Sequence, residues 1–286
     1  MHYVQARSVL TSKSLNIYRG CQHGCIYCDS RSLCYHMDHA FEDIEVKANV
    51  PELLERAMKS GRRPRMIGTG AMSDPYIPLE KNLCMTRKCL ELIDRYGYGA
   101  ALHTKSDLVL RDLDLLVSID RKAKAVVQMT VTTMDDDLCS ILEPGVCVTS
   151  RRFEVLKALR DAGIPTVVWM CPLMPFINDT ADNVLGIVDA CAEAGVKGIV
   201  QFGIGLTLRD GNREYCYKSL DRHFPGLKER YIRTYGNAYE LPSPNEATLK
   251  TVFHARCEAL GLWHDNDMIF RYMGTLEDPN VQLTFF

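Results

Sequence analysis

The feature that most constrains the fold of this 286-residue chain is a repeated alternation of short apolar runs with longer amphipathic stretches. The runs are rich in β-branched residues and predict six strands, at Leu15–Tyr18, Arg65–Thr69, Ala100–Thr104, Ala125–Thr133, Thr166–Cys171 and Gly198–Gly203. The stretches between them predict helices at Pro51–Ser60, Asn82–Tyr96, Arg111–Asp120, Ser150–Ala162 and Thr180–Ala194. Alternating strands and helices form a parallel sheet, and right-handed crossovers allow either an open sheet or a barrel.

The ends of the helices carry their own signals. Ser150, and Thr180 or Asp179, are predicted to cap helix N-termini, while Gly163 and Gly195 follow helix C-termini. Further helices are expected at Gly226–Tyr235 and Pro244–Leu262, followed by a short apolar run at Met268–Tyr272. No linker rich in Pro, Gly or Ser divides the chain. We therefore expect one domain over 1–286, with a core of about 14–210 and closing helices and a tail over 211–286.

Polar residues gather after the predicted strands. Cys21 follows the first strand, the segment Gly70–Tyr76 the second and Lys105 the third. Thr132 and Thr133 end the fourth strand, and Arg209 follows the sixth. In parallel α/β folds the chemistry lies beyond the carboxyl ends of the strands, so these residues are expected on one face of the molecule.

Cys21, Cys25 and Cys28 have the spacing C-x3-C-x2-C in the loop directly after the first strand. Soft thiolate ligands select iron–sulfur clusters and zinc. Three thiolates leave one metal position without a protein ligand, as catalytic metal sites do. The motif predicts a [4Fe–4S] cluster. The alternatives are a structural zinc site, with His23, Cys34 or His36 as the fourth ligand, and three cysteines that bind no metal.

The remaining composition is that of a folded protein, with a formal net charge of −2. This charge gives no support to a nucleic-acid surface, although nucleic acid stays a possible partner. No apolar stretch reaches the roughly 18 residues of a membrane span, and the first residues lack the apolar core of a signal peptide. We therefore expect a cytoplasmic protein that contacts no membrane. The nine other cysteines are interpreted as reduced, mostly buried side chains.

The cysteine motif, its aromatic Tyr27 and the six strand–helix units resemble the radical SAM (S-adenosylmethionine) superfamily. The sequence is similar in particular to the spore photoproduct lyase-like branch, also called DNA repair photolyase. The similar segments are Asn16–Ser32 (NIYRGCQHGCIYCDSRS), Ser73–Glu80 (SDPYIPLE), Thr104–Ser106 with Arg111 and Asp112, and Thr132 and Thr133 with Glu143 and Pro144. Within that branch the chain also resembles the radical SAM mobile pair proteins. The resemblance implies a partial (β/α)6 barrel of the TIM type, a parallel sheet with outer helices.

For the chemistry, the resemblance implies a [4Fe–4S] cluster on Cys21, Cys25 and Cys28 that cleaves SAM to a 5′-deoxyadenosyl radical, which abstracts a hydrogen atom from a substrate. It also implies a one-electron donor of the flavodoxin or ferredoxin type and allows a partner radical SAM protein. The candidate SAM contacts are Ser73 and Asp74 for the ammonium group, Lys105 for the carboxylate, Thr130 or Thr132 for the ribose, Tyr27 near the adenine, and Arg209 for SAM or substrate.

The chain departs from the branch at one position. Spore photoproduct lyases carry a hydrogen-donor cysteine two residues before the Ser-Asp pair, and this chain has Ala71 there. Cys34, Cys84 or Cys171 could supply a thiol instead. The substrate therefore stays open between a nucleic-acid lesion, the default of the branch, and a peptide or small molecule handled with a partner protein. A small-molecule enzyme would have a pocket capped by the segment Trp263–Phe286, whereas a non-catalytic zinc or iron–sulfur binding module would bind metal but not SAM.

Overall fold

Six parallel strands lie side by side in the order in which they occur along the chain. They are β3 (Ser14–Leu15), β6 (Met66–Thr69), β7 (Gly99–Thr104), β8 (Ala125–Thr130), β9 (Thr166–Trp169) and β10 (Gly198–Val200). The computed structural model describes residues 1–286 except 12–13, 62, 71 and 277–286. At one edge β2 (Leu10–Thr11) adds an antiparallel strand. The predicted α/β fold with a partial (β/α)6 barrel is confirmed.

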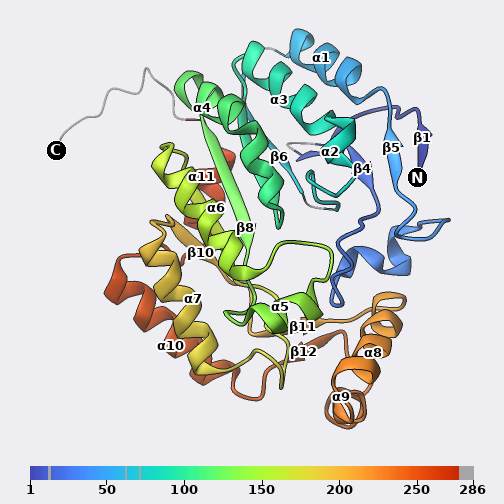
Figure 1. Cartoon of the computed structure of the whole chain (residues 1–286), viewed down its shortest axis with the longest axis vertical. Coiled ribbons are helices and arrows are strands. Elements are labelled where there is room, and N and C mark those ends of the chain that lie inside the picture. Colours follow the sequence, from blue (N-terminus) through green and yellow to red (C-terminus); the bar gives the residue numbers. More distant parts are fainter. Residues whose placement is uncertain (12–13, 62, 71, 277–286) are drawn as a thin grey trace.

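The crossover helices cover the outer side of this sheet (Figure 1). They are α1 (Val50–Ser60), α3 (Met85–Arg95), α4 (Leu113–Lys122), α6 (Thr149–Asp161) and α7 (Ala181–Glu193). The outward side chains of the strands and the apolar stripes of the helices form the main core, which includes Leu54, Ile67, Ile93, Leu102, Leu116, Val127, Leu156, Val168, Val188 and Ile199. Residues three and four apart share a helix face, which explains why the apolar periodicity located these helices.

The alternate residues of the strands point to the inside of the barrel. Here β6–β10 contribute a second, smaller core of Met66, Ala101, Val126, Val167 and Val200. A C-terminal helix, α11 (Asn266–Gly274), fills this space with Ile269 and Met273. The run Met268–Tyr272 lies within this helix, and α10 (Glu246–Leu260) before it packs on α7. One side of the barrel interior is therefore closed by apolar contacts.

Smaller elements surround the carboxyl ends of the strands. A three-stranded sheet of β1 (His2–Val4), β5 (Glu45–Lys47) and β4 (Tyr18–Arg19) contains residues near the N-terminus. The short 3-10 helices η1 (Asp29–Arg31) and η2 (Leu33–Tyr35) lie between β4 and β5 in the chain. The pair β11 (Gly205–Thr207) and β12 (Glu240–Pro242) flanks α8 (Asn212–His223) and α9 (Leu227–Tyr235). α8 contacts η1, so the last third of the chain lies beside the segment that follows the cysteines.

Three local predictions were wrong. The strand expected over Leu15–Tyr18 is divided between β3 and β4, which belong to different sheets, because Asn16 and Ile17 turn toward Lys47 and bond to it through their carbonyls. The helix expected over 82–96 is divided into α2 (Glu80–Leu83) and α3 by Cys84, whose φ is 51°. Ser150 lies inside α6 and bonds to Asp136, the first residue of α5 (Asp136–Leu142), instead of capping.

Other features agree with the expected signals. Thr180 caps α7 by accepting a hydrogen bond of 3.2 Å from the amide of Asn183. Gly163 and Gly195 follow α6 and α7 with φ of 81° and 71°, the left-handed region that glycine adopts most easily.

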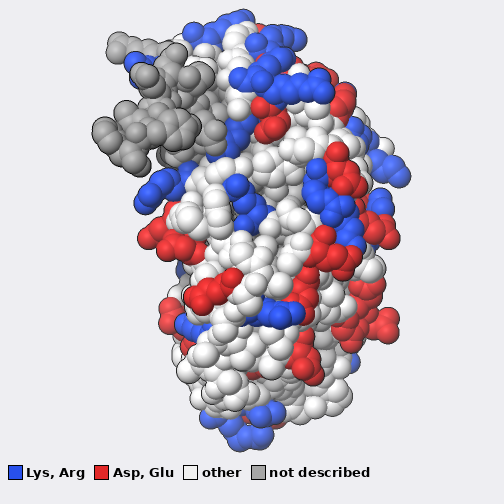
Figure 2. Space-filling view, turned by 90° about the vertical axis from the view of Figure 1, so that its left-hand side faces the viewer, with Lys and Arg blue, Asp and Glu red and all other residues white. Residues whose placement is uncertain are grey.

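The face seen in Figure 2 carries basic and acidic side chains interspersed with one another. Ion pairs join the outer helices, for example Lys157 with Glu193 and Arg256 with Asp189. Among the described residues, no helix is both long and apolar enough to cross a bilayer.

We predict that the chain depends on α11 for stability. Replacing Ile269, which is fully buried inside the barrel, with alanine should lower the free energy of unfolding by about 2–4 kcal/mol because a cavity remains. The matched control is Met268→Ala, at a neighbouring side chain that is 38% exposed. This variant should lose less than about 1 kcal/mol of the free energy of unfolding. Urea unfolding of the two variants measures the difference, and equal losses would contradict the packing described.

Candidate active site

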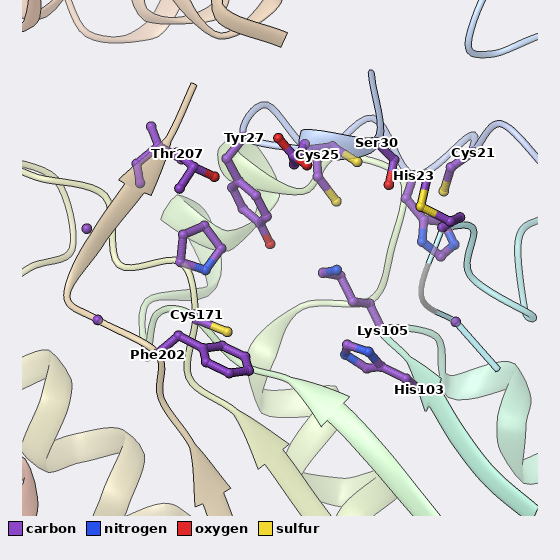
Figure 3. A pocket seen from close by; sticks show the side chains of 18 of the residues that line it. Cys21, His23, Cys25, Tyr27, Ser30, His103, Lys105, Cys171, Phe202 and Thr207 are labelled. Atoms are coloured by element: carbon purple, nitrogen blue, oxygen red, sulfur yellow. The ribbon is translucent and has the colours of Figure 1, made fainter. Parts of the chain in front are cut away.

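A cavity of about 550 Å³ lies at the carboxyl ends of the parallel strands. Its wall is formed on one side by the loop of Cys21, Cys25 and Cys28, and on the other by the ends of β6, β7 and β9 and the segment leading into β11. Figure 3 shows the cysteine loop opposite Lys105 and His103, with Cys171 and Phe202 beside them. The volume is typical of a site for a small organic cofactor. The structure thus brings the cysteines together with polar residues that follow three different strands.

Backbone hydrogen bonds hold the cysteine loop at several points. The amide of Cys21 donates to Phe41 O at 3.1 Å, and that of Ile26 donates to Leu142 O at 2.9 Å. The amide of Gly145 donates to His23 O at 2.8 Å. A Cβ atom at Gly145 would lie 2.7 Å from the carbonyl oxygens of Gln22 and His23, so only glycine permits this approach. The loop is therefore fixed before any cofactor binds.

The three thiols fit a cluster better than a single zinc ion. In the described part of the chain, no group that contains these cysteines brings three candidate ligand atoms within 4.8 Å of one another. One tetrahedral zinc needs its sulfurs closer than that, whereas a cuboidal cluster holds its thiolates on separate iron atoms. Of the alternative zinc ligands, His23 lines the cavity, while Cys34 and His36 are exposed and lie outside its lining.

The protonation of these thiols follows from their surroundings. Burial, together with the negative charge of Asp74, raises the pKa of Cys21 to about 12. Burial also raises the pKa of Cys25 well above its ordinary value, although the charge of Lys105 opposes this. Both thiols carry protons at neutral pH in the metal-free chain, so metal binding must release protons.

Ser73 and Asp74 follow β6 and are already engaged by the protein. The hydroxyl of Ser73 donates to Gly20 O at 2.6 Å, which ties this loop to the residue before Cys21. The carboxylate of Asp74 accepts bonds of 2.8 Å from the amide of Tyr76, the hydroxyl of Thr104 and the amide of Lys105. It joins the ends of β6 and β7 and lies 3.5 Å from Nδ1 of His23.

A buried polar network supports this loop from below. Arg111 donates to the carboxylates of Glu80 and Asp112 at 2.7–2.9 Å. The hydroxyl of Tyr76 donates to Asp112 at 3.1 Å, and Tyr18 donates to Glu80. Glu80 and Asp112 are fully buried, and buried carboxylates require such partners. The sequence segments Ser73–Glu80 and Arg111–Asp112 therefore form one structural unit.

Lys105 directs its ammonium group into the cavity (Figure 3). Among the described residues it makes no ion pair within 4.0 Å, and its Nζ lies 6.0 Å from the centre of the Tyr27 ring. Burial alone would lower the pKa of Lys105, but attraction to Cys25 in its thiolate form, and to the carboxylates of Glu143 and Asp74, outweighs it and raises the pKa above its ordinary value. Lys105 is thus a cation held beside the thiols and available to an anionic ligand.

Tyr27 anchors the cysteine loop from within. Its ring lines the cavity, and its hydroxyl donates to the buried carboxylate of Glu143. Arg152, also fully buried, pairs with Glu143 at 2.5 Å and donates to Thr130 O and Cys147 O at 3.0 and 2.9 Å. Burial by itself would raise the pKa of Glu143, but Arg152 and Lys105 hold that pKa below its ordinary value. Arg152 is therefore a partner of Glu143 in the protein interior.

Thr130, Thr132 and Arg209 do not line the cavity. The hydroxyl of Thr130 lies 2.9 Å from Nε2 of His103, which itself faces the cavity. Thr132 is buried, and its hydroxyl has no hydrogen-bond partner among the described residues. Arg209 reaches the site indirectly, since its Nε lies 3.5 Å from Asp29, a lining residue, and its other nitrogens bond to Cys34 and Tyr239.

The candidate thiols separate clearly in space. Cys171 lines the cavity, whereas Cys34 and Cys84 do not. Ala71, where related lyases carry their cysteine, lies outside the described residues. So does the end of the segment Trp263–Phe286, beyond residue 276. The described part of that segment fills the barrel interior through α11 and does not line the cavity.

Several residues of the site were missed by sequence reasoning. His103 and Phe202 line the cavity, and Trp169 stacks on His103 with ring centres 4.6 Å apart. A signal existed for His103, because it lies two residues before Lys105 and must share its face of β7. The partnership of Glu143 with Tyr27 had no sequence signal, because it joins residues 116 positions apart.

We predict a pH-dependent stability that originates at His103. Burial, and then the charge of Lys105, lowers the pKa of His103 to about 3. The unfolded chain binds this proton near pH 6.5 and the folded chain does not, so stability is lost as the pH falls from about 6.5 toward 3. The loss should reach at most about 1.4 kcal/mol per pH unit in the metal-free wild type, relative to His103→Gln. Urea unfolding of both chains at pH 7.0, 5.5 and 4.5 measures the free energy of unfolding. The same change with pH in the wild type and in His103→Gln would contradict the prediction.

Comparisons with known proteins agree with this geometry. The sequence profile of the Radical SAM superfamily matches residues 15–185, the span from β3 into α7. An uncharacterized protein of Mycobacterium tuberculosis is 28% identical over 236 residues, 80% of this chain and 68% of the relative. One of Methanocaldococcus jannaschii is 33% identical over 168 residues, 58% of this chain and 61% of the relative.

Among solved structures, a spore photoproduct lyase variant with bound AdoMet and a dinucleoside spore photoproduct superposes with a TM-score of 0.66. The match covers 92% of this chain and 80% of that one at 14% identity, so it establishes a shared fold. The superfamily uses a [4Fe–4S] cluster and SAM, and the residues of this cavity fit both. The chain therefore belongs to the radical SAM superfamily.

Proposed function

We propose that this protein is a radical SAM enzyme that holds a [4Fe–4S] cluster on Cys21, Cys25 and Cys28 and cleaves SAM in the adjoining cavity. One observation carries the proposal: the three thiols and the ammonium group of Lys105, which forms no ion pair with any described residue, face the same cavity at the carboxyl ends of the parallel strands. When bound, the cluster supplies the electron that cleaves SAM and so produces the 5′-deoxyadenosyl radical.

In this proposal the residues of the chain bind, orient and shield. Lys105 offsets the negative charge of the cluster thiolates and pairs with the carboxylate of SAM. Asp74 and Ser73 fix the loop after β6, whose carbonyl groups would accept hydrogen bonds from the ammonium group of SAM. Tyr27, held by Glu143, covers the cluster and borders the adenine. Thr130 acts through His103, which lines the cavity and would contact the ribose, and Arg209 acts through Asp29, another lining residue. The ribose contact of Thr132 stays a prediction.

The charges of the cavity favour one class of substrate over another. Lys105 is the only Lys or Arg among the described lining residues, whereas Asp29, Asp74, Glu240 and Glu246 all contribute carboxylates. A nucleic acid needs cations near its phosphates, so this lining favours a small molecule or a peptide. Cys171 is the thiol best situated to return a hydrogen atom, because Cys34 and Cys84 lie outside the lining.

The proposal includes other components. Enzymes of this superfamily need a reductant, which we propose to be a flavodoxin or ferredoxin, and a partner radical SAM protein could complete the choice of substrate. Packing of α10 on α7 and of α11 inside the barrel supports one domain over 1–286. The cytoplasm, where thiols stay reduced, is the expected compartment.

Cleavage of SAM tests this function directly. We predict that the chain, reconstituted anaerobically with iron and sulfide and then reduced, forms 5′-deoxyadenosine from SAM. Cys25→Ala should reduce the yield at least about 100-fold, because the cluster loses a ligand. Cys34→Ala, a matched cysteine that is exposed and outside the cavity, should leave the yield unchanged. If the wild type instead forms no cluster, takes up zinc that Cys25→Ala no longer binds, and cleaves no SAM, the protein is a metal-binding module.

Binding of SAM tests the role of Lys105. We predict that Lys105→Met weakens binding of SAM to the cluster-loaded chain about 10-fold or more, because a charge-assisted bond to the carboxylate is lost. Lys88→Met, on the exposed face of α3, is the matched control and should bind like the wild type. Equilibrium dialysis of chains with equal iron content measures the dissociation constants. Equal affinity of the two variants would remove Lys105 from the SAM site.

A further inference from the structure

A second group of metal-ligating side chains lies outside the cavity, on the sheet formed by β1, β5 and β4. One ligand atom from each of His2, His39 and Glu45 lies within 4.8 Å of the other two. His2 and Glu45 are register partners on neighbouring strands, and His39 belongs to the loop that leads into β5. The two imidazole rings meet edge to face with centres 4.7 Å apart.

Both imidazoles are oriented as metal ligands usually are. Nδ1 of His2 lies 3.2 Å from the carboxylate of Asp43, and Nδ1 of His39 lies 3.1 Å from Ala40 O. A histidine that binds a metal typically donates its other ring N–H to such an oxygen, which fixes the tautomer. With the proton on Nδ1, each Nε2 presents a lone pair.

The Nε2 atom of His39 needs a partner. It is buried and makes no hydrogen bond among the described residues, and the nearest Glu45 oxygen is 3.7 Å away, too far for one. A lone pair facing a carboxylate is unfavourable unless a cation lies between them. Arg19 does not fill this role, because it lies 3.8 Å from Glu45 and bonds to Tyr35 O and His36 O.

We propose that His2, His39 and Glu45 bind one divalent zinc-class ion, with a water molecule in the fourth position. Two imidazole nitrogens and one carboxylate oxygen are ligands that Zn²⁺ prefers. Tetrahedral bonds of about 2.1 Å bring ligand atoms to about 3.4 Å from one another, so small side-chain movements close the site. The ion would fasten the loop of His39 to the sheet, and this loop also provides Phe41 O, which accepts the amide hydrogen of Cys21.

Zinc titration of the cluster-loaded chain, without an affinity tag, tests this site independently of SAM chemistry. Loading the cluster first occupies Cys21, Cys25 and Cys28, so calorimetry should report one zinc per chain at the second site. His39→Ala should weaken this binding at least about 100-fold, and Asp43→Asn, which keeps all three ligands, about 10–100-fold. His223→Ala, an exposed histidine at the end of α8, should bind zinc like the wild type.

Thermal unfolding provides the second reading. Zinc should raise the unfolding midpoint of the wild type and of His223→Ala but not that of His39→Ala, because only the folded site binds the ion. If His39→Ala does not fold, the weaker zinc binding expected of Asp43→Asn tests the site instead. The proposal is overturned if the wild type binds no zinc beyond its cluster, or if the His39 and Asp43 variants bind it as tightly as the wild type. Loss of 5′-deoxyadenosine formation would instead refute the proposed function and leave this site untouched.

Discussion

The buried carboxylate of Glu143 is the interaction on which the geometry of the site depends. It accepts a bond from Tyr27, inside the cysteine loop, and pairs with Arg152 on α6. Removing one partner of a buried ion pair typically costs about 3–5 kcal/mol, because the other charge is left without compensation. The attachment of the cysteine loop to the barrel is therefore both strong and specific. The Glu143 carboxylate also lies near Lys105, and its negative charge helps to raise the pKa of that lysine.

The alternation of side chains along the strands explains why chemistry and stability occupy different parts of the same barrel. Outward residues pack on the helices. Inward residues near the start of the strands, such as Val126 and Val167, pack on α11. Two positions further along the strands, the inward residues include Gln128 and Trp169, which bond to each other at 3.0 Å. The cavity begins at this layer, where His103 lines it, and extends to Lys105 and Cys171, which follow their strands. Strand polarity alone therefore gathers residues from distant parts of the sequence.

Sequence patterns located what depends on local periodicity and short spacing. The parallel strands, the crossover helices and the cysteine loop follow from them, and so does the convergence of Cys21, Asp74 and Lys105 at one cavity. Contacts between side chains that neither periodicity nor motif spacing encodes could not be found this way. Arg152 has the sequence context of a surface residue yet is fully buried, because its partner Glu143 lies on the preceding loop. Thr130 does share the inward face of β8, but a strand pattern does not say how far along the barrel the cavity begins.

In the function proposed above, three cysteines hold a cluster that leaves one iron open for SAM. Electron paramagnetic resonance of the reduced, reconstituted chain, combined with iron and sulfide analysis, tests this most directly. We expect about four iron and four sulfide ions per chain and a cluster signal that changes when SAM is added. A chain that retains zinc in place of iron and sulfide, or a cluster signal that SAM leaves unchanged, would contradict it.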